Sequence, residues 1–178
     1  MRIVEFGVSS TPVFRYSEDV GKKIESGATY VGFDINRKYI GTISREEGIS
    51  IALGDMGKIP LMDNIADEIW VLNVFGGDFV NIPEKMPDGS IAYTLGVGRH
   101  FREMTRILKP GGKIYIGEWR PRISDSSWMK NDDYSEYGLS KKVYEGEALQ
   151  EFVEQHGFRF GHIWKDTPPF FIELTKSA

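Results

Sequence analysis

Short apolar runs of strand length alternate with amphipathic segments along most of the chain. Apolar runs that are connected by helices are typical of a parallel sheet covered on both faces. We therefore predict an α/β fold with a mostly parallel sheet and right-handed crossovers. The predicted strands are Arg2–Phe6, Tyr30–Asp34, Ile49–Leu53, Asp67–Val74, Lys113–Trp119, Phe158–Trp164 and Phe170–Leu174.

The clearest helical pattern covers residues 99–108. Phe101, Met104 and Leu108 recur there at the spacing of one helix face, and the opposite face carries charged residues. Weaker patterns predict the helices Glu18–Glu25, Lys38–Glu47 and Glu147–Gln155. Stretches rich in polar residues or glycine predict loops over residues 8–16, 75–98 and 121–144. Long loops in compact domains are usually functional or mobile.

The last two predicted strands are joined by Lys165–Pro169. This connection is too short for a parallel crossover, so the two strands are expected to be antiparallel. The sheet is therefore expected to end in an antiparallel hairpin. The length of the chain, 178 residues, suits one domain spanning residues 1–178.

Acidic residues stand at or just after the ends of three predicted strands. Asp34 ends the second strand, Glu5 precedes Gly7 at the end of the first, and Asp55 follows the third. Because the carboxyl ends of parallel strands meet at one edge of a sheet, these acids are expected to converge on one crevice. A carboxylate such as Asp34 can accept two hydrogen bonds from a ribose diol.

Each acid also has a purely structural interpretation. Asp34 can cap the helix that follows it, because an acid before a helix accepts hydrogen bonds from the first backbone amides. Asp55 can be a turn residue after Gly54. Glu5 can be an exposed acid on an edge strand.

Composition and charge restrict the chemistry. A net charge of −4 gives no electrostatic reason to expect nucleic acid as a partner. The lack of cysteine excludes disulfides, thiolate catalysis and cysteine-ligated metals, and fits a cytoplasmic location. The histidines His100, His156 and His162 are scattered without metal-ligand spacing, so no metal is expected. No apolar run approaches the roughly 20 residues of a membrane helix, and no signal-peptide segment opens the chain.

Several single residues keep two interpretations. His100 begins the clearest helix, where it either reaches the crevice or is a solvated helix-start residue. His156 and His162 are interpreted as structural. Asp78 follows two glycines and is a candidate base, although a lone acid in a glycine loop is a weak signal. The aromatic residues of the 121–144 stretch either line a substrate pocket or pack as a lid.

The order of these motifs resembles that of the class I S-adenosylmethionine-dependent methyltransferases, in particular methyltransferase type 11-like domains. The matching segments are Val4–Ser9, Asp34, Gly54–Met56, Ile59–Leu61, Ile65–Ile69 and Phe101–Lys113. The resemblance implies a Rossmann-like sheet with an antiparallel C-terminal hairpin. One departure stands out: the family pattern acid-x-Gly-x-Gly-x-Gly retains only Gly7, because Ser9 and Thr11 replace the later glycines.

The resemblance also implies S-adenosylmethionine as cofactor and a set of residues that hold it. By this resemblance Asp34 holds the ribose, Asp55 meets the adenine amino group, and Ile35 and Met56 flank the adenine. The residues implied at the site as a whole are Glu5, Gly7, Val8, Ser9, Asp34, Ile35, Asp55, Met56, Asn73 and Val74. No catalytic residue is assigned.

The expected function is methyl transfer to a small molecule, catalysed mainly by proximity. The Asn/Asp-Pro-Pro-aromatic motif is absent after the fourth strand, where Asn73-Val74-Phe75-Gly76 stands, and this also favours a small acceptor over nucleic acid. One alternative is a catalytically inactive binding or partner protein on the same scaffold. Another is a nicotinamide-dependent oxidoreductase, whose G-x-G-x-x-G does not follow the first strand here. A homodimer is a further possibility.

Overall fold

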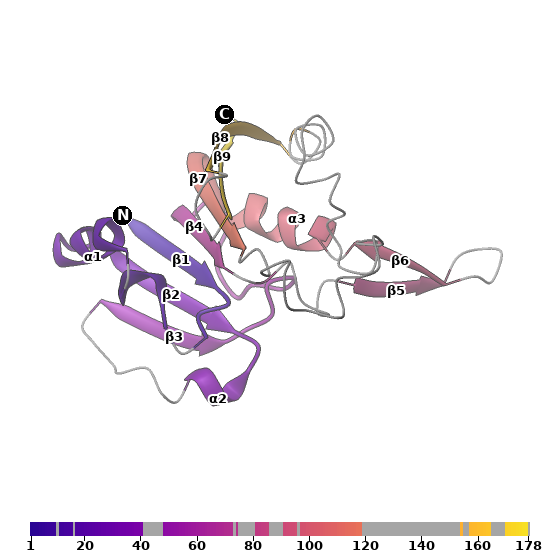
Figure 1. Ribbon diagram of the computed structural model, residues 1–178, viewed down its shortest axis with the longest axis horizontal. Coiled ribbons are helices and arrows are strands. Elements are labelled where there is room, and N and C mark those ends of the chain that lie inside the picture. The colour runs from indigo at the N-terminus through magenta and orange to yellow at the C-terminus, as the bar shows by residue number, and fades with distance from the viewer. Residues whose placement is uncertain are drawn as a thin grey trace, which may run out of the picture.

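A computed structural model describes residues 1–9, 11–15, 17–40, 48–72, 74, 81–85, 91–95, 97–118, 154, 157–164 and 170–177. Its main feature is a seven-stranded sheet (Figure 1). The strands are β1 (Arg2–Phe6), β2 (Thr29–Asp34), β3 (Ile49–Leu53), β4 (Ala66–Leu72), β7 (Leu108–Glu118), β8 (Phe158–Trp164) and β9 (Phe170–Lys176). They lie in the order β3-β2-β1-β4-β7-β9-β8.

The pairing of the strands confirms the predicted fold class. The neighbouring pairs from β3 through to β7 are all parallel. β9 is antiparallel to both β7 and β8, so the sheet ends in the expected reversed hairpin. The carboxyl ends of β1, β2, β3 and β4 consequently share one edge of the sheet.

Strand β7 begins earlier than predicted, at Leu108 rather than Lys113. Its pairing with β4 shifts register between Ala66, opposite Leu108, and Glu68, opposite Lys113. The residues between include Pro110, which has no amide hydrogen to donate to the sheet. The early start is therefore an irregular extension of β7 and not a regular continuation of its pairing with β4.

The helices that flank the sheet are α1 (Glu18–Glu25), α2 (Arg37–Ile40) and α3 (Val97–Ile107), with a short 3-10 helix η1 (Val13–Arg15) in the loop after β1. The prediction of α1 is confirmed, and the side chain of Ser17 accepts a hydrogen bond from the Val20 amide as an N-cap. The predicted helix Lys38–Glu47 is shorter in the described residues, because 41–47 lie outside them. Of the predicted helix Glu147–Gln155 only Glu154 is described.

The prediction of a loop over residues 75–98 is wrong in part. The strands β5 (Asn81–Lys85) and β6 (Ile91–Leu95) form a separate antiparallel hairpin, and α3 already begins at Val97. The hairpin extends away from the main sheet (Figure 1). The sequence between the two strands contains Asp88-Gly89, a common hairpin-turn dipeptide.

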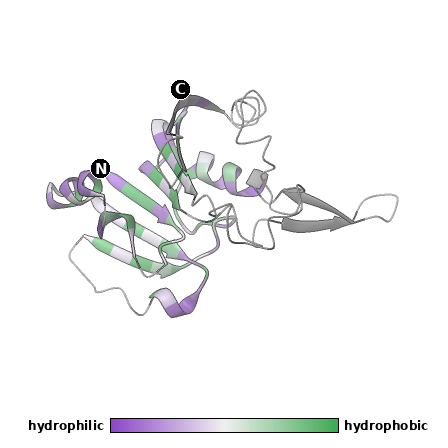
Figure 2. Ribbon diagram, viewed as in Figure 1, coloured by the Kyte–Doolittle hydropathy of each residue, from purple (hydrophilic) through white to green (hydrophobic). Residues whose placement is uncertain are grey.

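Two apolar cores cover the two faces of the sheet. Ile3 and Val4 are neighbours on β1 and point to opposite faces. Ile3 packs in the cluster that includes Val20 of α1, whereas Val4 packs in the larger cluster that includes Met104 of α3. The central strands carry much of the hydrophobic sequence, and α1 and α2 are largely hydrophilic (Figure 2). None of the helices in the described part of the chain has the length and hydropathy needed to cross a membrane.

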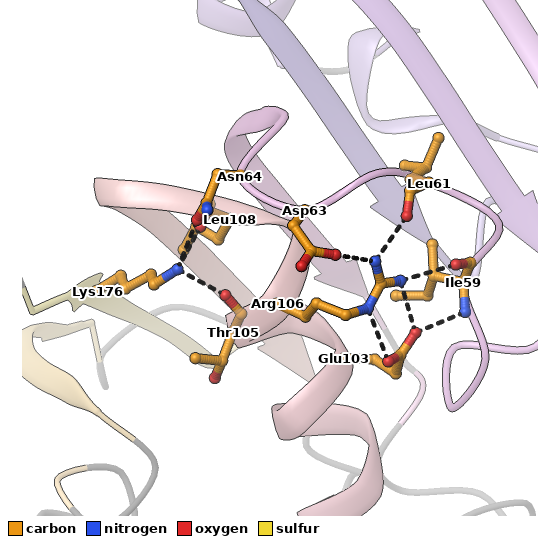
Figure 3. A network of polar contacts seen from close by, with 9 residues as sticks. All are labelled: Ile59, Leu61, Asp63, Asn64, Glu103, Thr105, Arg106, Leu108 and Lys176. Carbon is orange, nitrogen blue, oxygen red and sulfur yellow. Dashed lines mark hydrogen bonds and ion pairs between the residues drawn. The ribbon is translucent and has the colours of Figure 1, made fainter.

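The guanidinium group of Arg106 ties α3 to the segment between β3 and β4 (Figure 3). It donates hydrogen bonds to the carbonyl oxygens of Ile59 and Leu61, at 2.9 and 2.7 Å. It also pairs with the carboxylates of Asp63 and Glu103, at 2.7 and 2.9 Å. The hydrogen bonds to Glu103 and Asp63, together with the negative charges of these two carboxylates, raise the pKa of the Arg106 guanidinium, so Arg106 is always charged.

Lys176 of β9 binds the same, carboxyl end of this helix. The Lys176 ammonium donates to the carbonyl oxygens of Thr105 and Leu108, at 2.7 and 2.6 Å, and to Asn64 Oδ1 at 3.1 Å. A positive charge at the carboxyl end of a helix also interacts favourably with the helix dipole. Two cationic side chains, Arg106 and Lys176, therefore join the carboxyl end of α3 to the segment before β4 and to β9 (Figure 3).

Replacing Arg106 is expected to loosen this connection. Arg106→Met keeps the aliphatic stem but leaves the carbonyls of Ile59 and Leu61 without this donor, so we expect the free energy of unfolding to fall by about 2 kcal/mol. Urea unfolding measures the change. The control is Arg102→Met on the exposed face of the same helix, for which we expect less than about 0.5 kcal/mol. Equal losses in the two variants would contradict the anchoring role.

Candidate functional site

The loop after β1 folds tightly across the ends of β2 and β4. The Gly7 amide donates to the Phe33 carbonyl at 3.0 Å. Gly7 has φ +77°, and a Cβ there would lie 2.5 Å from Val74 Cγ2 and 2.8 Å from the Leu72 carbonyl oxygen. Only glycine fits this close approach, as expected for the residue that begins the loop.

Asp34 lies at the centre of the candidate site and joins two segments. The residue is buried, at 8% exposed. Its Oδ2 accepts the Ser9 amide at 2.8 Å, and its Oδ1 accepts the Asn36 amide at 2.7 Å. A carboxylate has about four lone-pair sites, so about two of them remain for a ligand. Ser9 itself has φ +53°, in the left-handed region where the family pattern places glycine.

Asn36, and not Asp34, caps the helix that follows β2. The side chain of Asn36 accepts the Lys38 amide at 3.0 Å, which places Asn36 at the N-cap of α2. Asp34 instead connects the β2 end to the loop after β1 through Ser9. Holding these two segments together is therefore one function of Asp34.

The turn after β3 brings Asp55 beside this group. The Gly54 amide donates to the Asp34 carbonyl at 3.0 Å, which joins the turn to the end of β2. Asp55 Oδ1 accepts the Gly57 amide at 2.7 Å, and Oδ2 pairs with Arg99 at 2.5 Å. Asp55 is thus both a turn residue and an ion-pair partner, and its side chain is 56% exposed.

The two predicted apolar walls differ in exposure. Ile35 is 56% exposed beside Asp34, whereas Met56 is 6% exposed and packs in the main core. Val8 is also buried, and its side chain packs against Gly32. Ile35 therefore offers the open apolar surface of the site. Asn73 lies outside the described residues.

Glu5 lies beneath the loop and not on the surface. It is 1% exposed, and its Oε2 accepts the Val13 amide at 2.8 Å and the Tyr30 hydroxyl. Oε1 has no hydrogen-bond partner among the described residues. The alternative of an exposed edge acid is wrong, because β1 lies between β2 and β4 in the sheet.

Burial raises the pKa of Glu5 to about 7. The hydrogen bonds from Tyr30 and Val13 lower this pKa in part, and the nearby charge of Asp34 raises it further. Glu5 is thus a buried acid that titrates near neutral pH, in contact with the loop that carries Gly7.

His100 is also buried, at 6% exposed, so its interpretation as a solvated helix-start residue is wrong. Burial lowers its pKa, while the charge of Asp55 raises it and that of Arg99 lowers it. His100 therefore lies within electrostatic reach of Asp55. His162 lies in β8 as predicted, and His156, Asp78 and the aromatic residues of 121–144 lie outside the described residues.

Sequence reasoning missed two partners in the site. Arg99 was only one of several charged residues on a helix face, and Tyr30 was only a strand residue. Both become informative through contacts with distant acids, Arg99 with Asp55 and Tyr30 with Glu5. The nearest sequence signal was the position of Arg99 at the start of a crossover helix, because such a helix begins at the same sheet edge as the acids.

Solved structures of low sequence identity share the architecture. An S-adenosylmethionine-dependent methyltransferase from Aquifex aeolicus has a TM-score of 0.63 at 16% identity, covering 98% of this chain and 81% of that one. The PH0226 protein of Pyrococcus horikoshii OT3 has a TM-score of 0.66 at 17% identity, covering 99% and 82%. A putative S-adenosyl-L-methionine-dependent methyltransferase from Methanococcus maripaludis has a TM-score of 0.58 at 24% identity, covering 99% and 78%.

The chain has the fold of the class I methyltransferases. This follows from the structural similarities together with the strand order and the reversed β9. No protein-family model matches the sequence, and no curated protein sequence matches it. In this methyltransferase fold, Asp34, Ile35 and Asp55 lie together at the carboxyl ends of the parallel strands.

The described residues fit one side of S-adenosylmethionine better than the other. Asp34 keeps lone pairs for a ribose diol, and the exposed Ile35 and Asp55 suit an adenine. On the methionine side, the space above Gly7 is filled by Val74, and the Ser9 amide is used by Asp34. Among the described residues no group of three metal-binding side chains is present.

Proposed function

We propose that this protein binds S-adenosylmethionine and transfers its methyl group to a small molecule. The observation that carries the proposal is the nearly buried Asp34 carboxylate at the end of β2, beside the exposed Ile35 and bonded to the loop after β1. The methyltransferase fold brings this acid to the edge of the sheet where ligands bind in α/β proteins. A carboxylate in this position suits a ribose diol.

The residues have separate tasks in this proposal. Asp34 accepts the ribose hydroxyls on its free lone pairs, and Asp55 accepts a hydrogen bond from the adenine amino group. Ile35 packs against the adenine ring. Gly7, Val8 and Ser9 provide backbone on the methionine side, with Glu5 beneath them.

A bound sulfonium supplies an activated methyl group with a good leaving group. The protein then needs mainly to hold a nucleophile in line with the methyl carbon and to exclude water. No side chain in the described residues is required as a strong base. We therefore assign no catalytic residue.

The acceptor is proposed to be small because of the charge of the chain. Its net charge of −4 does not favour binding to the phosphate backbone of a nucleic acid, and the segment after β4 lacks the Pro-Pro-aromatic motif. We propose that the acceptor enters over the loops that flank the site.

A second candidate is a binding or partner protein with the same fold. The engagement of the Ser9 amide by Asp34 and the retention of a single loop glycine favour it. A putative methyltransferase bound to the Trm112 methyltransferase activator from Haloferax volcanii has a TM-score of 0.61 at 13% identity, covering 99% of this chain and 83% of that one. A protein partner, including a second copy of this chain, is therefore the alternative to catalysis.

The deciding experiment is calorimetric titration with S-adenosylmethionine and S-adenosylhomocysteine. Asp34→Asn is expected to weaken both by about 30-fold, because hydrogen bonds to a charged acceptor contribute about 2 kcal/mol. The control is Glu25→Gln, an exposed acid of α1, for which we expect unchanged affinity. Unchanged affinity in Asp34→Asn would contradict the ribose role.

The titration, combined with a methylation assay over a panel of acceptors, separates the alternatives. Binding together with methylation of an acceptor supports the enzyme. Binding of S-adenosylhomocysteine without methylation of any acceptor in a panel supports the partner protein. No binding of either compound at millimolar concentration would exclude the proposed cofactor, and NADH fluorescence would then test the nicotinamide alternative.

A further inference from the structure

We propose that Arg99 is a positioning residue that orients Asp55 and thereby makes the site select adenine over hypoxanthine. The proposal rests on the proposed function, because it concerns the base of the bound nucleoside. It assigns a role to the hydrogen bond between Arg99 of α3 and Asp55 of the turn after β3, two residues far apart in sequence.

Three hydrogen bonds form a closed arrangement around Asp55. The Arg99 Nη2 pairs with Asp55 Oδ2 at 2.5 Å, and the Arg99 Nε donates to the Gly57 carbonyl at 2.9 Å. The Gly57 amide donates back to Asp55 Oδ1 at 2.7 Å. Each carboxylate oxygen therefore has one fixed partner, so the plane of the carboxylate is fixed by both Arg99 and the turn.

Gly57 provides the surface on which Arg99 rests. A Cβ at Gly57 would lie within 2.5 Å of the Arg99 Cζ and Nη2 atoms. Any side chain there would displace the guanidinium group from this position. Gly57 and Arg99 therefore depend on each other, and a change at either one should have the same effect on Asp55.

The ion pair is more useful for orientation than for stability. The Arg99 and Asp55 side chains are 39% and 56% exposed, and pairs this exposed contribute little to folding. Without its partners, an exposed carboxylate would sample several rotamers. With both oxygens engaged, its remaining lone pairs keep one direction toward a ligand.

A fixed acceptor discriminates between two purine bases. Adenine carries an amino group that donates a hydrogen bond, whereas hypoxanthine carries a carbonyl oxygen at the same position. A carboxylate held toward that position bonds the amino group and repels the carbonyl. Sites built around one polar group reject ligands that lack its complement, because the group is left unpaired. A rotating carboxylate can turn away, so the preference would fall.

The test compares S-adenosylhomocysteine with its hypoxanthine analogue, S-inosylhomocysteine, by calorimetry on the full chain. We expect the wild-type protein to prefer adenine by about 20-fold, equal to about 2 kcal/mol. Arg99→Gln and Gly57→Ala should both reduce the preference to about threefold. Arg102→Gln, on the exposed face of α3, should retain it. Full preference in both Arg99→Gln and Gly57→Ala would overturn the proposal.

A measurement without ligand separates this proposal from the proposed function. Hydrogen exchange of the Gly57 amide should be at least about tenfold faster in Arg99→Gln, since its acceptor Asp55 is no longer held. The amide of Ile65, which bonds to the Ile107 carbonyl at 2.8 Å, should be unchanged and reports on the fold. If the wild-type protein binds neither nucleoside, the proposed function fails. If the Gly57 amide exchanges at the wild-type rate, the positioning role of Arg99 fails whatever the ligand result.

Discussion

Gly7→Ala is expected to lower the free energy of unfolding by about 3 kcal/mol. The substitution adds a single methyl group, yet two separate effects act on it. First, a non-glycine residue in the left-handed conformation at φ +77° lowers the free energy of unfolding by about 1 kcal/mol. The new Cβ would also lie 2.5 Å from Val74 Cγ2 and 2.8 Å from the Leu72 carbonyl oxygen. The Leu72 carbonyl belongs to the backbone of β4, so it has little freedom to move away.

Gly111→Ala is a matched control that separates the two effects. Gly111 has φ +74°, almost equal to that of Gly7, but a Cβ there would meet nothing within 4 Å. We expect it to lose only about 1 kcal/mol. Urea unfolding of both variants gives the difference, about 2 kcal/mol, as the contribution of the close approach between the loop and β4. Equal losses would show that the loop is not held against β4.

The fold was predictable because its main signals are local. Each strand of the parallel sheet is a short apolar run, and the face of α3 repeats at helical spacing. The reversal of β9 followed from the short connection before it. The hairpin β5–β6 was missed because its glycine and proline residues were interpreted as a loop, although Asp88-Gly89 is a turn signal.

The candidate site was only partly predictable because its contacts join distant segments. Asp34 and Asp55 were found as strand-end acids, and both lie at the expected edge. The burial of Glu5 depends on β1 lying inside the sheet, which no local pattern reports. The Arg99–Asp55 pair joins residues of two elements that follow different strands, so only the folded chain brings it together.

Glu5→Gln is expected to change how stability depends on pH. The pKa of Glu5 rises from its ordinary value of 4.5 to about 7 in the folded protein, mainly because of burial. Below about pH 4.5 the group is neutral in both states and its ionisation costs nothing. Above about pH 7 it is ionised in both states, and the buried charge then lowers the free energy of unfolding by about 3 kcal/mol. The wild-type protein should therefore lose stability as the pH rises from about 4.5 to about 7.

Glutamine preserves the shape of the side chain and cannot ionise. The free energy of unfolding of Glu5→Gln minus that of the wild-type protein should increase by about 3 kcal/mol between pH 4 and pH 8. Urea unfolding at intervals of one pH unit measures it, and Glu25→Gln, an exposed acid of α1, controls for general charge effects. A difference that is independent of pH would contradict a buried acid with a raised pKa.

The charge of Asp34 gives a second check on the same group, because it raises the pKa of Glu5. In Asp34→Asn the upper end of the pH range of the stability loss should therefore move to lower pH, and the total loss should be smaller. A range that does not move would show that the two acids are electrostatically independent. Glu5 accepts a hydrogen bond from the Val13 amide, and Asp34 accepts one from the Ser9 amide. A shift would therefore establish that two electrostatically coupled acids hold the loop after β1.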